Sequence, residues 1–250
     1  MQIPAWEVIY HVKMKTRRAQ QHFDALIGEV DHWLNPPPYT ITCKYDFEKV
    51  LEIWRVDMHL TPEPVPLLLG DFICCLRSSL DQLAWGLAHL DSKRVFSRKE
   101  QREICFLIFR EDDATYRERR KLFPPAIASI FDTLQPYLLG NAFRDDPLWQ
   151  LNELWLLDKH RSIPVNSHSL NVRFPMHGWE SYLREFDNGF EVPFPLKLAW
   201  LSPVDLKPSI TLEVLFGEWM GAFEVSLPRL REINEFVSND VIPRFAGFFP

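Results

Sequence analysis

Hydrophobic residues recur three and four positions apart over long stretches of the first two-thirds of the chain, which is the spacing of amphipathic helices. Between Val12 and Leu34 this spacing predicts one helix, which Pro36 ends. It also predicts a longer helix over Leu67–Leu90, where the apolar side chains form one wide stripe that belongs in a core. Further helices are expected over Ala114–Leu122, Pro125–Leu134, Asp146–His160 and Leu227–Val241.

Two other regions alternate between apolar and polar residues, as half-buried β-strands do. The first region contains two strands, Tyr39–Phe47 and Val50–Leu60, joined closely enough for a hairpin. The second runs from Ile163 to Glu218 and includes the alternating pieces Leu170–Phe174 and Ile210–Phe216. Both regions therefore contribute to a sheet.

These patterns predict an α+β fold, in which a helical bundle with a buried central helix packs beside a mostly antiparallel β-sheet. The helical part covers mainly residues 12–34 and 66–161, the sheet uses residues 39–60 and 163–218, and the C-terminal helix covers 227–241. The proline-rich pieces are short and lie between patterned segments, so they separate elements rather than domains. We therefore expect one compact domain over residues 1–250.

The composition is that of an ordinary globular chain, with 46% hydrophobic and 25% charged residues. No apolar run is long enough to cross a bilayer, and the first residues lack the pattern of a secretory signal, so the expected location is the cytoplasm. A net charge of -6 argues against broad nonspecific binding of nucleic acids, but it allows a local basic pocket. The four cysteines lack CxxC spacing and no nucleotide motif is present, so we expect neither a metal nor a cofactor.

The long central helix is unusual because it combines a buried stripe with three charged residues, Asp71, Arg77 and Asp81. On a helical wheel, Arg77 and Asp81 fall on a face whose other residues are small, which lets a second helix approach closely. Their spacing also permits a contact between the two side chains. Asp71 lies on a third face together with Gln82. Since buried charges require partners, these side chains mark a polar cluster inside the bundle.

A second polar cluster ends the helix before Ile163 and consists of Asp158, Lys159, His160 and Arg161. Asp158 continues the apolar stripe of this helix and should point inward, while Lys159 flanks the stripe. His160 lies away from the stripe, and Arg161 stands at the helix end, where a cation suits the terminal carbonyl groups. If the two helices are neighbours, an ion pair between Asp158 and the central arginine is the simplest way to satisfy both charges.

The two clusters have two interpretations. In the first, Arg77, Asp81 and Asp158 hold the helices in register. In the second, His160 acts as a general acid or base, and Arg77 and the cations beside His160 stabilise phosphate charge. The second arrangement suits metal-independent RNA cleavage or another phosphate-directed reaction.

Several groups of residues, in this order along the chain, resemble an uncharacterised family of bacterial proteins. They are Gly70–Trp85, with the pattern GD-x4-LRS-x-LD-x-LAW, then Phe106–Phe109, Leu134-Gln135-Pro136-Tyr137 and Asp158-Lys159-His160-Arg161. The resemblance spans roughly the first two-thirds of the chain and implies no established activity. In that family's pattern the residue after the second Asp is often His, and the resulting Arg-x4-His is similar to the RNase motif of the HEPN (higher eukaryotes and prokaryotes nucleotide-binding) helical superfamily. This chain has Gln82 there, which cannot exchange a proton near neutral pH, so the resemblance implies a degenerate RNase.

Two hypotheses for the function follow. The first is a HEPN-like protein that binds RNA or a nucleotide and is a candidate metal-independent ribonuclease. Its catalytic candidates are His160 and Arg77, and the surrounding polar cluster comprises Asp71, Asp81, Gln82, Asp158, Lys159 and Arg161. The second is a noncatalytic interaction module whose Arg/Asp cluster is structural and whose sheet recruits a partner. The candidate partners are therefore RNA or a nucleotide, another protein, or a second copy of the chain as a homodimer, and no membrane is expected.

Overall fold

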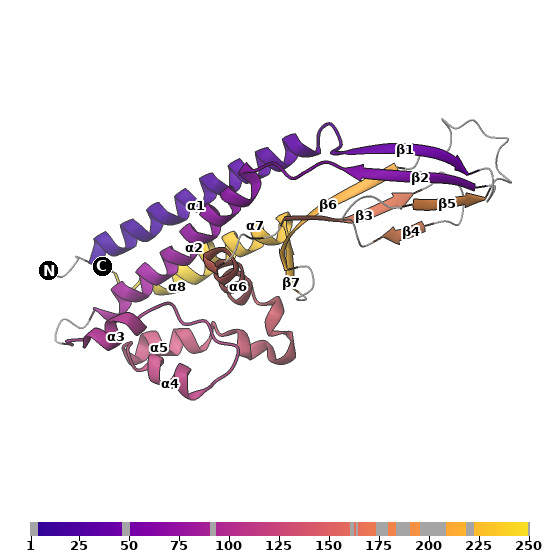
Figure 1. Ribbon diagram of the computed structural model, residues 1–250. Helices are drawn as coiled ribbons and strands as arrows, with labels where there is room; N and C mark the ends of the chain where they lie inside the picture. Colours follow the sequence, from indigo (N-terminus) through magenta and orange to yellow (C-terminus); the bar gives the residue numbers. More distant parts are fainter. Residues whose placement is uncertain are drawn as a thin grey trace. The chain divides into compact units, whose positions relative to one another are not determined.

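The computed structural model describes residues 5–46, 51–90, 94–160, 163, 165–173, 180–183, 191–195, 209–218 and 223–249. The fold is α+β and dominated by helices, and the described strands pair in antiparallel fashion (Figure 1). Where the sequence predicts one compact domain, the contacts group the chain into two compact units. The helical unit comprises Met1–Leu26, Pro66–Ile163 and Leu227–Pro250, and the sheet unit comprises Ile27–Val65 and Pro164–Ser226.

The predicted helices are all present, and prolines mark the starts of three of them. The helical elements are α1 (Ala5–Leu34), α2 (Pro64–Ala88), α3 (Arg98–Glu103), α4 (Ala114–Arg120), α5 (Pro125–Asp132), the 3-10 segment η1 (Pro136–Asp145), α6 (Pro147–His160), α7 (Leu227–Phe236), the π-helical turn η4 (Val237–Val241) and α8 (Ile242–Ala246). Pro64, Pro125 and Pro147 stand first in their helices, where the missing N–H costs nothing. α3, η1 and α8 are additions to the prediction, and the first helix begins earlier than expected.

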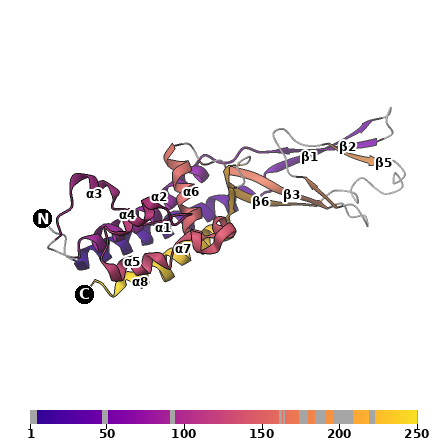
Figure 2. The ribbon, with the colours of Figure 1, turned by 90° about the horizontal axis from the view of Figure 1, so that it is seen from below.

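The helices α1 and α2 lie side by side and run in opposite directions (Figures 1 and 2). Val8 near the start of α1 contacts Gly86 near the end of α2, and the rings of Phe23 and Phe72 lie 5.1 Å apart further along the pair. The Cγ1 atom of Val8 lies too close to the position of a Cβ on Gly86 for a side chain to fit there, so the helices approach closely because this residue is glycine. This contact lies on another face of α2 than Arg77 and Asp81, because Gly86 is rotated by about 140° from Asp81 at 100° per residue.

The core of the helical unit includes four buried phenylalanines from separate segments. The ring of Phe131 in α5 lies 5.0 Å from that of Phe106, 4.7 Å from that of Phe123 and 5.2 Å from that of Phe245 in α8. Phe106 belongs to Ile104–Phe109, which is neither helix nor strand and which we call the strap. These tilted and edge-on contacts fix the strap against α5 and α8.

The sheet unit contains two sheets. One has the order β1 (Tyr39–Asp46), β2 (Leu51–Met58), β5 (Glu191–Pro195), and the other has the order β4 (Glu180–Leu183), β3 (Val165–Arg173), β6 (Ser209–Glu218), β7 (Phe223–Ser226). Tyr39 pairs with Met58 and Asp46 with Leu51, which confirms the antiparallel pairing expected of the first two strands. In β6, Gly217 has a φ of 138° and the carbonyl oxygen of Phe223 lies too close to the position of a Cβ for a side chain, so only glycine fits there.

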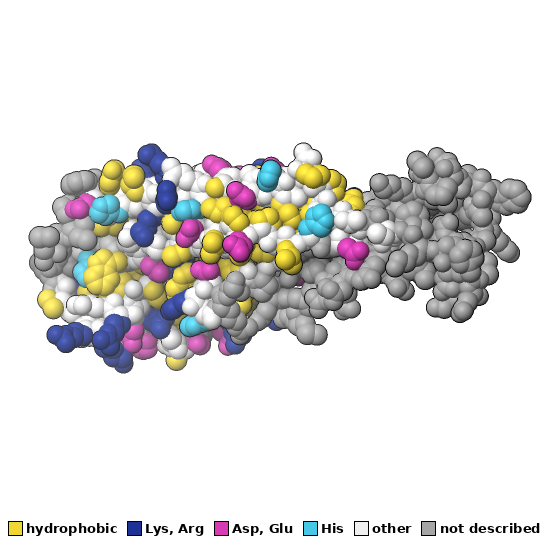
Figure 3. Space-filling model, turned by 45° about the horizontal axis from the view of Figure 1, so that its top comes forward, with side chains coloured by type: hydrophobic (Ala, Val, Ile, Leu, Met, Phe, Trp, Pro, Cys, Tyr) yellow, Lys and Arg dark blue, Asp and Glu magenta, His cyan; other side chains and the backbone are white. Residues whose placement is uncertain are grey.

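No helix among the described residues is long and apolar enough to cross a membrane. Figure 3 shows one face, on which Lys and Arg side chains lie among Asp, Glu and His side chains and apolar groups. Over the part of this face that is described, the two signs of charge are therefore mixed rather than separated into a single basic surface.

Candidate functional site

Arg77 lies inside the helical unit, with only 5% of its surface exposed. Its Nη1 pairs with Oδ1 of Asp81, one turn later on α2, and its Nη2 donates to the carbonyl oxygen of Phe106 at 3.3 Å. The guanidinium carbon lies 5.3 Å from the ring centroid of Trp155, which belongs to α6. The charge is thus surrounded by a carboxylate, a carbonyl group and an aromatic ring, which is how a buried cation is stabilised.

Asp81 binds the same residue of the strap as Arg77 does. Its Oδ1 accepts a hydrogen bond from the backbone N–H of Phe106 at 3.0 Å. The pair on α2 therefore satisfies both backbone polar groups of Phe106. The described structure gives the strap no neighbouring strand, so its buried N–H and C=O groups need side-chain partners of this kind.

Gln135 holds the next part of the strap and is almost fully buried. Its Nε2 donates to the carbonyl oxygens of Leu107 and Phe131, each at 2.9 Å, and its Oε1 accepts from the N–H of Phe109 at 3.0 Å. Three of the sequence groups described above thus meet at the strap. They are the Leu-Arg-Ser-x-Leu-Asp segment of α2, the Phe-Leu-Ile-Phe segment and the Leu-Gln-Pro-Tyr segment. Arg77, Asp81 and Gln135 all form hydrogen bonds with the backbone of the strap.

Asp158 does not form the ion pair with Arg77 that the sequence suggested: no such pair occurs among the described residues. The prediction that the two helices are neighbours is confirmed, because Oδ1 of Asp158 lies 2.5 Å from the position of a Cβ on Gly70. Asp81 meets Arg77 instead, since it is one turn away on the same helix. Burial raises the pKa of the Asp158 carboxyl, and the negative charge of Asp71 raises this pKa further.

Asp71 is not a buried charge, although the sequence placed it in a largely enclosed helix. Its side chain is 64% exposed, and its Oδ2 lies 3.9 Å from Nδ1 of His22 on α1. Cys74 and Trp85 on α2 are also exposed. One side of α2 therefore reaches solvent, because α1, α6 and the strap cover only the other parts of its circumference.

The remaining candidates do not gather around Arg77. Lys159 and His160 are exposed at the end of α6, and Nζ of Lys159 lies 4.9 Å from the ring centroid of Trp155. Arg161 lies outside the described residues. Gln82 is partly buried, and its Oε1 has no hydrogen-bond partner among the described residues. No hydrogen bond or ion pair within the described part of the chain joins His160 to Arg77.

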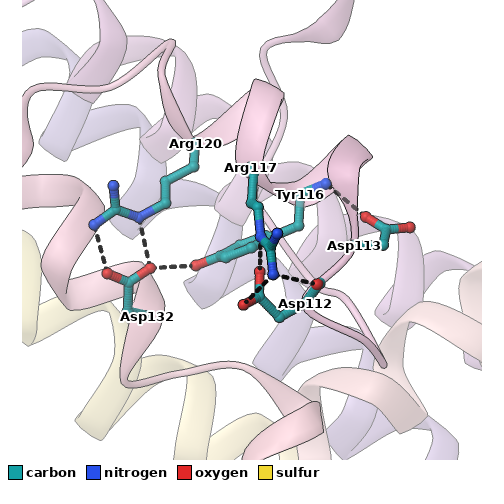
Figure 4. Close-up of polar contacts among 6 residues, drawn as sticks. All are labelled: Asp112, Asp113, Tyr116, Arg117, Arg120 and Asp132. Atoms are coloured by element: carbon teal, nitrogen blue, oxygen red, sulfur yellow. Dashed lines mark hydrogen bonds and ion pairs between the residues drawn. The ribbon is translucent and has the colours of Figure 1, made fainter.

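Another polar cluster, which the sequence analysis did not predict, joins α4 to α5 (Figure 4). Arg120 donates from Nε and Nη2 to the two carboxylate oxygens of Asp132 at 2.7 and 2.6 Å, and the hydroxyl of Tyr116 donates to Oδ1 of Asp132 at 2.6 Å. The hydrogen bonds from Arg120 lower the pKa of Asp132, whereas burial raises the pKa of Tyr116. The sequence of α4 alone could not predict the partner of Arg120, because Asp132 belongs to another helix.

A metal site is not formed by the described residues, since they contain no group of three or more His, Cys, Asp or Glu side chains that could hold an ion. Comparison with known proteins finds no matching protein family, no matching curated protein and no matching solved structure. The resemblances to the bacterial family and to HEPN proteins therefore stay predictions. The site is interpreted from its own geometry, which is that of a polar cluster built around the strap.

Proposed function

We propose that this chain is a noncatalytic interaction module, in which the Arg77–Asp81 pair belongs to the scaffold. The observation that carries the proposal is the enclosure of Arg77 by Asp81, the Phe106 carbonyl group and Trp155. An arginine that stabilises a substrate phosphate must direct free N–H donors at a site that the substrate can reach. At 5% exposure, this guanidinium directs Nη1 and Nη2 at groups inside the protein, and its buried Nε has no hydrogen-bond partner among the described residues.

The residues that could transfer a proton also support a noncatalytic role. General acid–base catalysis needs a titrating group within hydrogen-bond reach of the reacting atoms. Gln82 cannot exchange a proton near neutral pH, and the exposed His160 has no bond to Arg77 among the described residues. In the Arg-x4-His motif an arginine acts together with the histidine. Cleavage by this chain would have to use His160 without Arg77.

The test compares stability with RNA handling in the variants Arg77→Ala and His160→Ala, with Lys99→Ala on the exposed surface of α3 as the control. Each protein is melted and is then incubated with a fluorescent single-stranded RNA in the presence of a metal chelator. We expect Arg77→Ala to melt at a clearly lower temperature, the other two to melt like the wild type, and the RNA to stay intact throughout. Cleavage by the wild type that His160→Ala abolishes would contradict the proposal.

A second candidate function is the binding of RNA or a nucleotide without cleavage. The observation that favours it is the exposed position of Lys159 at the end of α6, 4.9 Å from the ring centroid of Trp155, with the exposed His160 next in the sequence. A cation beside an aromatic ring suits phosphate and base contacts, whereas the nearby carboxylate of Asp158 opposes them. The measurement is RNA affinity as a function of salt: if this candidate holds, a Lys159→Ala variant binds more weakly and with a shallower salt dependence, and the Lys99→Ala control does not.

A further inference from the structure

A cavity of about 440 Å³ lies in the helical unit, at the turn between α4 and α5 and beside the end of α2. Its volume falls in the range of pockets that hold small organic molecules. The described residues that line it fall into two chemical groups, cationic and apolar, and none of them is acidic. They are Arg94, Arg120 and Lys121, with Ala88, Phe123, Pro124, Pro125 and Ala128.

Arg120 is held in a fixed orientation at the wall of this cavity. Asp132 engages its Nε and Nη2, while its third guanidinium nitrogen, Nη1, makes no hydrogen bond to the described residues (Figure 4). About a third of the side chain is exposed. A guanidinium that is fixed on one edge and free on another is ready to bind an oxyanion at little further cost in side-chain entropy.

Arg94 and Lys121 are positioned together on the same wall. Nη1 of Arg94 donates to the carbonyl oxygen of Lys121 at 2.8 Å, and its guanidinium carbon lies 4.6 Å from the ring centroid of Phe96. Lys121 is exposed, and its ammonium group contacts Glu118 at 2.6 Å. Arg94 lies 3.9 Å from Glu100. These surface ion pairs are weak and screened, so they leave both cations able to bind an anion in the cavity.

The rest of the lining is apolar. Ala88, Phe123 and Ala128 are nearly fully buried and form the inner, apolar part of the lining, whereas the side chains of Arg94 and Arg120 are about a third exposed. The first turn of α5 also lines the cavity, and no side chain of the described residues caps this helix end, which carries a partial positive charge that adds to the charge of the three cations.

We propose that this cavity binds a small molecule that carries an oxyanion, a phosphate or a carboxylate, on an apolar body. The oxyanion is bound by Arg94, Arg120 and Lys121, and the apolar body packs against Ala88 and Ala128. The site lies apart from the Arg77 cluster, so this proposal stands or falls independently of the proposed function.

The test titrates the full chain with phenyl phosphate, benzoate and inorganic phosphate, by calorimetry and by following the methyl signals of Ala88 and Ala128 in NMR spectra. We expect saturable binding of at least one aromatic probe, at higher affinity than inorganic phosphate, with shifts of both methyl signals. The stronger of the two aromatic probes identifies the oxyanion. Absence of saturable binding of every probe up to about 10 mM, weaker than any useful small-ligand affinity, would overturn the proposal.

Variants locate the binding. Lys121→Gln changes an exposed residue and should leave the melting temperature unchanged while weakening binding severalfold, and adding Arg94→Gln should weaken it by about tenfold or more. The matched control is Arg98→Gln with Lys99→Gln, which removes the same charge from α3 outside the cavity. Ala128→Leu fills the apolar end and should weaken the aromatic probe more than inorganic phosphate. Equal loss of affinity in the lining and control variants would place the binding elsewhere and refute the proposal.

Discussion

The backbone N–H of Phe106 donates to the carboxylate of Asp81 at 3.0 Å, although the two residues lie 25 positions apart. Arg77, the ion-pair partner of Asp81, donates to the carbonyl oxygen of the same phenylalanine. Two charged side chains of one helix thus replace the neighbouring strand that an extended segment would otherwise need. The charges in α2 are explained by the backbone they serve.

Arg77→Ala should destabilise the protein by about 2 to 3 kcal/mol, because the change removes the buried cation that pairs with the partly exposed Asp81 and leaves the Phe106 carbonyl group without this donor. The measurement is the free energy of unfolding from urea titration. Arg98→Ala, on the exposed surface of α3, is the control and should shift that free energy by about 0.5 kcal/mol or less. A variant at Arg77 as stable as this control would show that the cation is not part of the scaffold.

Gln135→Leu should destabilise the protein by about 2 to 3 kcal/mol, since leucine has a similar volume but removes the hydrogen bonds of the Phe109 N–H and the Leu107 carbonyl group, while the Phe131 carbonyl group keeps one from the N–H of Leu134. Thermal unfolding compares it with Gln101→Leu, which changes an exposed glutamine that makes one hydrogen bond, to the carbonyl oxygen of Phe96. The expected order is a large loss for Gln135 and a small one for Gln101. Equal losses would mean that the hydrogen bonds of Gln135 contribute little.

Gly70→Ala should destabilise the wild-type protein, because its new methyl group would lie 2.5 Å from Oδ1 of Asp158. In an Asp158→Ala background the same change should stabilise by about 1 kcal/mol, the helix propensity gained when alanine replaces glycine. The cycle of unfolding free energies measures this coupling. Gly28→Ala on α1, where a Cβ would contact nothing within 4 Å, is the control and should stabilise in both backgrounds. Additive effects of Gly70→Ala and Asp158→Ala would contradict the close approach of α2 and α6.

The pH dependence of stability should distinguish Asp158 from Asp132. Burial and the charge of Asp71 raise the pKa of Asp158 in the folded state above its ordinary value of 3.8, so ionisation destabilises the fold as the pH rises through that pKa. Asp158→Asn should therefore raise the melting temperature at about pH 7 and have no such effect at about pH 3. The opposite sign applies to Asp132, whose pKa is lowered chiefly by the hydrogen bonds from Arg120.

Asp132→Asn should accordingly lower the melting temperature at about pH 7, and this loss should fade as the pH falls through the lowered pKa of the folded state. Melting curves of both variants and the wild type across this range make the comparison. The same sign for both variants at about pH 7 would refute the assignment of their environments.

The helices were predictable because most of the apolar side chains that recur at helical spacing in α1, α2 and α6 are buried. The two stretches of the sheet unit were also predictable, because alternation marks residues 39–60 and 163–218, but the grouping of the contacts into two compact units was not, since a hydrophobic pattern does not show how many contacts join the parts. The polar cluster was found from the burial expected of Arg77, but its partner was misassigned. A helical wheel shows which residues share a face of one helix. It does not show which other segment, here the strap with Phe106, packs against that face. The cavity escaped notice because Arg94 and Arg120 come from segments that no pattern links.

The central claim is that Asp81 holds the strap through the N–H of Phe106, and amide hydrogen exchange tests it most directly. In the wild type the amides of Phe106 and Phe109 should both exchange slowly, since Asp81 and Gln135 bind them. In Asp81→Ala the account predicts fast exchange at Phe106 and retained protection at Phe109. Unchanged protection of Phe106 in that variant would contradict the account.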